Sequence, residues 1–290
     1  MKGFEKINQY VYHLSPIGNA FGGGITLVVG KSKFLIDCGA SDSVVTECLV
    51  PALKELGFSI KNIDYVLFTH CHPESIGGAH KLRSLLSPSA RIMAYGKQAE
   101  KLKNPTYYLA KACNLYPDYD LPFREIRGIL ADGLANEENI IFSELYPIAA
   151  PGHDDDCVCW YHIESKTLIS GDAIQCDGTK RTGIAYYNNL KSYKNTLKDL
   201  TNNLEISTIV CSQTYFGSSD IIRDSEKCTE ALQLSYNCTE QYQQFVDAYI
   251  KGNKIKRDRV RVEDIAQNYF ENKEKPLSLA YSMITLSEHI

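Results

Sequence analysis

The sequence of 290 residues contains no long hydrophobic run, no excess of basic residues and no Cys-x-x-Cys pair. A membrane-spanning helix needs roughly 18 apolar residues in succession, so we expect no membrane association. Lys and Arg number 31 against 35 Asp and Glu, which gives a net charge of −4. This balance lacks the basic surface that attracts nucleic acid, so we expect a small-molecule substrate and no nucleic-acid partner.

The N-terminal residues MKGFEKINQY also lack an apolar signal segment. Ten cysteines follow, most of them in apolar, strand-like runs such as FLIDCG and TIVCSQ. In such runs free cysteine behaves as a small buried hydrophobe, and disulfides persist mainly in oxidising compartments. We therefore expect a cytoplasmic protein with reduced, mostly structural thiols.

Strand-like and helix-like segments alternate through residues 1–95 and again through residues 140–215. Runs such as GGGITLVVG, KFLIDCG and KTLISGDAI are rich in β-branched residues and bounded by glycine, which predicts strands. Apolar residues at helical spacing predict helices over 43–56 and 190–204. The alternation indicates an α/β protein in which two sheets pack face to face with helices outside.

The remaining segments differ in pattern. The chain after residue 219 is helical in pattern, so we predict one domain over residues 1–219 and a helical C-terminal extension, residues 220–290, packed on it. Residues 98–116 are also helical in pattern. The polar, proline-interrupted stretch 117–140 is a candidate lid beside a functional site.

The segment most informative about chemistry is residues 69–78, which read THCHPESIGG and follow an apolar strand. Alternate residues of an extended chain point to the same side, so His70 and His72 can reach one point in space. Two further apolar strands end in a Gly-His and a Gly-Asp turn, which place His153 and Asp172 at strand ends. Imidazoles and carboxylates that converge there are suitable ligands for Zn²⁺ or Fe²⁺.

These ordered motifs, together with the early FLIDCG strand, resemble the metallo-β-lactamase superfamily over roughly residues 10–215. The resemblance implies a four-layer αββα sandwich with a metal site at one edge of the two sheets. It also implies that His70, His72 and His153 bind one metal ion and that the Asp172 carboxylate bridges to a second one.

Three positions depart from the pattern of the family, which is H-x-H-x-D-H followed by a histidine at the end of a later strand. This chain reads H-x-H-x-E-S, with Glu74 and Ser75 in place of Asp and His, and it offers Gln213 in place of the later histidine. Serine and glutamine are not strong zinc ligands. We therefore predict one divalent metal ion, zinc first and iron or manganese as alternatives, with a second metal weak or absent.

The leading hypothesis for function is a metal-dependent hydrolase of a small ester, thioester, lactone or amide, which uses a metal-activated water. Glu74 and Asp172 are the candidate catalytic carboxylates, and Glu74 would handle the proton. Asp37 matches a residue that orients the ligands in the family. Candidate orienting or substrate-contacting residues are Asp37, Ser75, Gln213 and Tyr215.

Two other functions stay open at this point. Some relatives oxidise persulfides with O₂ at one iron ion held by two histidines and one aspartate. In this chain the two histidine ligands would be His153 and either His70 or His72, and the aspartate ligand would be Asp172. A chain that lacks two expected imidazoles is alternatively a non-catalytic, ligand-binding member of the fold. The helical extension supplies either a pocket wall or the contact of a homodimer.

Overall fold

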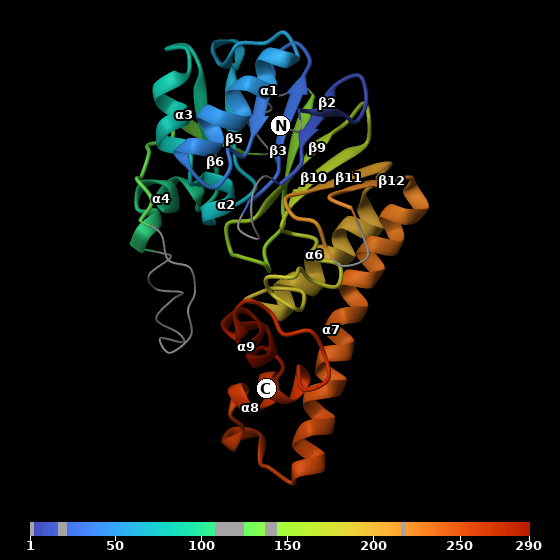
Figure 1. The fold of residues 1–290 in the computed structure, drawn as a ribbon. Coiled ribbons are helices and arrows are strands. Elements are labelled where there is room, and N and C mark those ends of the chain that lie inside the picture. Colours follow the sequence, from blue (N-terminus) through green and yellow to red (C-terminus); the bar gives the residue numbers. More distant parts are fainter. Residues whose placement is uncertain (1–2, 17–21, 108–124, 137–143, 216–218) are drawn as a thin grey trace.

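The computed structural model describes residues 3–16, 22–107, 125–136, 144–215 and 219–290, and Figure 1 shows how their helices and strands are arranged. Seven of the described strands form a first sheet, in chain order. They are β1 (Glu5–Lys6), β2 (Val11–Leu14), β3 (Ile25–Val29), β4 (Lys33–Ile36), β5 (Tyr65–Leu67), β6 (Arg91–Tyr95) and β7 (Gly133–Ala135). Neighbouring strands are antiparallel from β1 to β4 and parallel from β4 to β7.

The other described strands form a second sheet in the order β12-β11-β10-β9-β8. They are β8 (Leu145–Ala149), β9 (Val158–His162), β10 (Thr167–Gly171), β11 (Thr208–Cys211) and β12 (Ile221–Arg223). The β10–β11 pair is parallel and the other pairs are antiparallel. The described helices are η1 (Val44–Leu49), α1 (Val50–Glu55), η2 (Ile60–Asn62), α2 (Pro73–Ile76), α3 (Ala79–Leu85), α4 (Gln98–Lys103), α6 (Leu190–Asn203), α7 (Ser225–Asn253), η3 (Arg257–Arg259), α8 (Val262–Tyr269) and α9 (Leu279–Ser287).

Three groups of buried residues show how the layers pack. One group lies between the sheets and joins Val28 of β3 to Trp160 of β9 and Val210 of β11. Leu27, the neighbour of Val28, belongs to a second group with α1 and α3, because successive strand residues face opposite sides of a sheet. A third group packs α6 to α9 against the other face of the second sheet. The predicted αββα sandwich is confirmed, with α1 and α3 on one side and α6 and α7 on the other (Figure 1).

Residues 221–223 correct the sequence prediction, which gave a helix from residue 220 onward. They form β12, and Ile221 and Ile222 pair in antiparallel register with Val210 and Ile209 of β11. β-branched residues suit a pleated surface, and a partner strand decided the conformation of this short segment. The helix then begins at Ser225, where the Asp224 side chain accepts a hydrogen bond from the backbone N–H of Glu226.

The stretch 117–140 was expected as a candidate lid, and the structure corrects part of that expectation. Its residues 133–135 form β7, which pairs in parallel with β6 and extends the first sheet beyond residue 95. Residues 117–124 and 137–140 lie outside the described residues. In the predicted helix 98–116, α4 ends at Lys103, and residues 108–116 are likewise outside the described part.

The C-terminal helices reach the loop between β10 and α6. Ser282 and Thr285 of α9 donate side-chain hydrogen bonds to the backbone carbonyls of Thr182 and Ala185, at 2.7 and 3.2 Å. Figure 1 shows the long helix α7 leading away from the sheets, with α8 and α9 beside its far half. The domain boundary at residue 219 stays a prediction. No helix in the described ranges has both the length and the apolar character to cross a membrane.

His289, just beyond α9, gives the extension a predicted pH dependence. Its Nδ1 donates to Gln243 Oε1 at 3.0 Å and its Nε2 accepts from the Tyr187 hydroxyl at 2.7 Å. Burial, helped by the charge of Lys194, lowers the pKa of His289 from 6.5 to about 4. Between these values the unfolded chain binds the proton more readily than the native protein does, so stability falls as the pH falls from 6.5 to 4.

We expect this group to contribute about 2 kcal/mol of pH-dependent unfolding free energy over that window. The measurement is urea unfolding at pH 6.5 and 4.5 on the natural chain and on His289→Gln. The variant is expected to lose less stability than the natural chain when the pH is lowered. If the two proteins lose equal stability, His289 is not the group responsible.

Candidate metal centre

His70 is oriented from behind by a chain of hydrogen bonds that starts at Asp37. The Asp37 carboxylate accepts from the backbone N–H of Thr69 at 2.8 Å and from the Thr69 hydroxyl at 2.7 Å. Because that hydroxyl donates to Asp37, it accepts from His70 Nδ1, 3.0 Å away. His70 Nε2 is consequently the lone-pair nitrogen, and it is buried without a hydrogen-bond partner among the residues that the structure describes.

Glycines place the other two strand-end ligands. Gly152, which precedes His153, has a φ of 145°, and a Cβ there would lie 2.4 Å from the backbone of α6. Gly171, which precedes Asp172, has a φ of 55°, and a Cβ there would lie 2.4 Å from the Thr69 side chain. Only glycine tolerates both the conformation and the close approach. The Gly-His and Gly-Asp turns therefore bring His153 and Asp172 close to the segment that carries His70.

The structure brings together the side chains of His70, His72, Glu74 and His153, which we call the central cluster. One ligand atom from each lies within 4.8 Å of the others. His72 Nδ1 is 3.0 Å from His153 Nε2, and Glu74 Oε1 is 3.5 Å from His70 Nε2. Asp172 Oδ2 lies beside the cluster, 3.7 Å from His153 Nε2 and 4.0 Å from His70 Nε2.

The imidazoles of His72 and His153 are oriented in a complementary way. His153 Nδ1 donates to the Tyr186 backbone carbonyl at 3.0 Å, which leaves Nε2 as the acceptor nitrogen. His72 presents the opposite atom: its Nε2 is 3.3 Å from the Asp154 carboxylate, and its Nδ1 faces the cluster. His153 Nε2 and His72 Nδ1 thus face the same point of the cluster, 3.0 Å apart.

The charges around the cluster create a negative electrostatic environment. Burial by itself lowers the pKa of His70, but the nearby carboxylate of Glu74 and the charge of Asp172 raise it to about 9. Burial raises the pKa of Asp172 to about 6, with a further contribution from Glu74. His153 has its pKa lowered by burial and by its two histidine neighbours, so it remains neutral. This environment stabilises a cation at His70 Nε2.

The residues present fit a divalent metal ion. Ligand atoms at about 2.1 Å from a tetrahedral zinc ion are about 3.4 Å apart, and the distances between 3.0 and 4.0 Å in the site bracket this value. Nitrogen and carboxylate ligands suit zinc, iron and manganese alike. His70 Nε2, fully buried and without a hydrogen bond in the described part of the chain, is the atom that most requires a ligand.

Of three further residues predicted from the sequence, Ser75 and Tyr215 contact His70 and Asp172, whereas Gln213, in the ranges that the structure describes, does not. Ser75 Oγ is 3.4 Å from His70 Nδ1, on the side of the ring away from the cluster. The Tyr215 hydroxyl donates to Asp172 Oδ1 at 3.4 Å. Gln213 is partly exposed and, within the described residues, makes no hydrogen bond or ion pair with the cluster or with Asp172.

Arg181 was not predicted from the sequence. It follows β10 by ten residues, in a loop without a recognisable motif, and its Nη1 is 3.9 Å from Glu74 Oε2. Its guanidinium lies 4.6 Å from the ring centre of Tyr281, which comes from α9. Burial would raise the pKa of Glu74, but the nearby His70 imidazole and the charge of Arg181 lower it below its usual range. Glu74 is therefore an ionised carboxylate.

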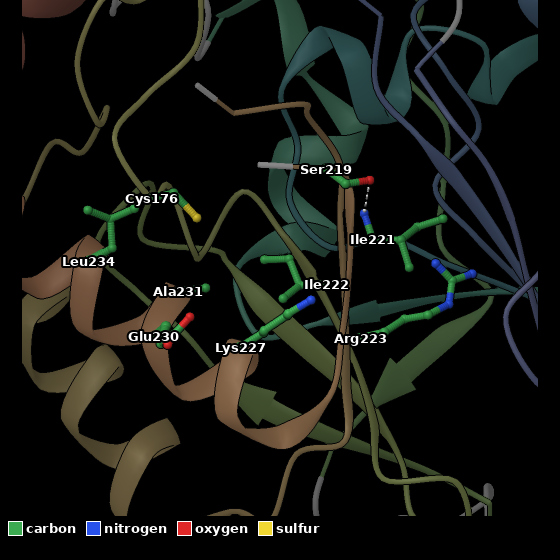
Figure 2. Close-up of a pocket in the computed structure, with 9 residues that line it drawn as sticks. All are labelled: Cys176, Ser219, Ile221, Ile222, Arg223, Lys227, Glu230, Ala231 and Leu234. Carbon is green, nitrogen blue, oxygen red and sulfur yellow. Dashed lines mark hydrogen bonds between the residues drawn. The ribbon is translucent and has the colours of Figure 1, made fainter. Parts of the chain in front are cut away.

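A cavity of about 590 Å³ lies elsewhere, between β12 and the first turns of α7. Figure 2 shows its lining, which includes Cys176, Arg223 and Lys227. It contains none of the cluster residues, so we assign the metal chemistry to the central cluster.

Comparisons with known proteins agree with this geometry. A family model described as the metallo-beta-lactamase superfamily matches residues 19–213. A metallo-beta-lactamase family protein from Thermus thermophilus has a solved structure that aligns with a TM-score of 0.74 and 19% identity, over 98% of this chain and 94% of that one.

Two curated proteins are similar over parts of the sequence. A beta-lactamase-like protein 2 homolog from Caenorhabditis elegans is 24% identical over 233 residues, which are 80% of this chain and 61% of that protein. A ribonuclease Z from Clostridium kluyveri is 42% identical over 60 residues, 21% of this chain and 18% of that enzyme. The chain thus matches less than two thirds of the length of either relative.

Proposed function

The chain belongs to the metallo-β-lactamase superfamily, and on that premise we propose that it is a metal-dependent hydrolase of a small ester, thioester, lactone or amide. The observation that carries the proposal is the central cluster, in which one ligand atom of each residue lies within 4.8 Å of the others, together with Asp172 Oδ2, 3.7 Å from His153 Nε2. One divalent ion, for which zinc is the first candidate, would be held by His70, His72, His153 and Asp172. Ser75 and Gln213 offer no imidazole for a second metal.

A divalent ion held there would lower the pKa of a coordinated water from about 15.7 to about 7 and polarise a carbonyl oxygen. Glu74 Oε1 lies 3.5 Å from His70 Nε2 and 3.8 Å from His72 Nδ1, beside any group that these nitrogens hold. Because Arg181 helps to keep Glu74 ionised, Oε1 is available to take a proton from water and to pass it to the leaving group.

The surroundings of the cluster favour an apolar or planar acyl group in the substrate. The Tyr186 ring stands edge-on to the His153 ring with centres 5.0 Å apart, and the Tyr281 ring lies 5.3 Å from Tyr186. Aromatic walls with a few polar groups are typical of sites for small organic molecules. Because Tyr281 belongs to α9, the helical extension contributes to this wall. A homodimer contact stays a prediction.

The proposal is tested by loading metal-free protein with zinc, iron or manganese and measuring metal content, hydrolysis and O₂ uptake. We expect one equivalent of zinc and hydrolysis of at least one class among nitrophenyl esters, acyl thioesters, lactones and anilides, without O₂ uptake. Iron-dependent O₂ uptake with a persulfide would instead identify an oxidoreductase. A protein that binds none of the three metals and is unchanged by chelator would be a non-catalytic member.

A further inference from the structure

The acidic residues that follow His153 surround one lysine. Lys101 Nζ of α4 lies 2.8 Å from Asp154 Oδ2, 2.7 Å from Asp155 Oδ1 and 2.9 Å from Asp156 Oδ1. The Lys101 side chain is only 9% exposed. An ammonium group with three carboxylates at this distance is held firmly in place, so the run of carboxylates is already neutralised in part by a cation of the chain itself.

Asp154 connects this lysine to a ligand of the proposed metal. Its Oδ2, the oxygen that contacts Lys101, is also 3.3 Å from His72 Nε2. Asn188 Nδ2 and the backbone N–H of Asp155 donate to the other oxygen, at 3.4 and 2.7 Å. An ionised carboxylate only accepts hydrogen bonds, so His72 Nε2 must carry the proton, and Nδ1 is left to bind an ion held between it and His153 Nε2, 3.0 Å away.

Helix α4 also contacts both segments that carry the histidine ligands. Gln98, the first residue of α4, is fully buried, and its Nε2 donates to the carbonyl of Phe68 at 3.2 Å and to that of Asp156 at 3.1 Å. Phe68 precedes the His70 segment, and Asp156 follows His153. One helix therefore fixes, through Gln98 and Lys101, the approach of His72 to Asp154.

We propose that Asp154, held by Lys101, is a positioning residue that keeps the proton of His72 on Nε2 and so selects Nδ1 as the metal-binding atom. The proposal rests on the metal site proposed above. Histidine ligands depend on such partners for tautomer and ring orientation, and loss of a partner typically weakens metal affinity 10- to 100-fold.

The test uses Asp154→Asn, with Asp155→Asn as the matched control. Asp155 contacts Lys101 but makes no contact with His72 among the described residues. The ¹⁵N signals of histidine report the tautomer of His72 at alkaline pH in metal-free protein, with His72→Asn for assignment. We expect the Nε2–H form in the natural chain and in Asp155→Asn, and a mixture of both tautomers in Asp154→Asn.

Zinc affinity, measured by competition with a chelating dye, is the second readout. Asp154→Asn is expected to lose about 10- to 100-fold and Asp155→Asn less than about threefold. Lys101→Gln is also expected to bind zinc more weakly, with a smaller loss of affinity than Asp154→Asn. An unchanged tautomer and affinity in Asp154→Asn, or an equal loss in Asp155→Asn, would overturn the proposal.

The two proposals fail in distinguishable ways. Zinc binding with the expected tautomers but without hydrolysis of any substrate class would contradict the proposed function and support the positioning role. Hydrolysis with zinc, together with a His72 tautomer that is the same in the natural chain and in Asp154→Asn, would support the proposed function and contradict the positioning role of Asp154.

Discussion

His153→Ala is expected to weaken zinc binding by at least about 100-fold and to remove hydrolytic activity with it. His153 supplies an acceptor nitrogen 3.0 Å from His72 Nδ1 and 3.7 Å from Asp172 Oδ2, so its loss leaves the proposed ion without a central ligand. Metal content after dialysis, measured by elemental analysis, checks this. The natural chain should retain one equivalent and the variant none.

His80→Ala is the matched control, because His80 is exposed on α3, away from the cluster. It should retain the metal content of the natural chain. If His153→Ala retains its zinc, the site described here does not bind the metal. If the natural chain binds two equivalents, the prediction of a mononuclear site is wrong and Glu74 or Gln213 acts as a ligand.

Glu74→Gln is expected to lower kcat by about 10²- to 10⁴-fold while zinc remains bound. Glutamine keeps the size of glutamate but cannot take a proton, and the side chain at this position is buried beside His70 and Arg181. The measurement combines steady-state kinetics with metal content. Both are needed because they separate a role in proton transfer from a role in metal binding.

Glu100→Gln on α4 is the control for the loss of one carboxylate, since Glu100 is exposed to solvent. It should leave both kcat and zinc content unchanged. A Glu74→Gln protein that loses its zinc would show that Glu74 is a ligand instead. A variant with normal kcat would show that another group handles the proton.

Local sequence patterns predicted the parts of the site that depend on short-range geometry. In an H-x-H segment that follows a strand, His70 and His72 point to the same side of the chain. The turns at Gly152 and Gly171 set the positions of His153 and Asp172, which follow them. The order of strands and helices likewise predicted two sheets packed face to face with helices outside, and the resemblance to the family implied the four-layer αββα sandwich. The strand ends and turns require only a few neighbouring residues, so they are visible in the sequence.

The contacts of Arg181, Lys101 and Asp154 could not be predicted in this way. Arg181 meets Glu74 from a loop without a motif, and Lys101 meets Asp154 across more than fifty residues of chain. Long charged side chains are usually solvated on a surface, and the sequence gives no sign that Arg181 and Lys101 are held near a site; Asp154 directly follows His153, but its partners are not visible in the sequence. Only the packing of α4 and of the β10–α6 loop reveals their partners.

The sequence by itself determined the sandwich, the strand ends that carry the histidines and Asp172, and the absence of imidazoles at Ser75 and Gln213. The tertiary structure alone decided which nitrogens of His72 and His153 face each other, that Glu74 is paired with Arg181, and that Tyr281 of α9 packs against Arg181. The reason is physical: strand ends and turns follow from local backbone preferences, whereas tautomers and ion pairs are set by atoms from distant segments that meet only in the folded protein.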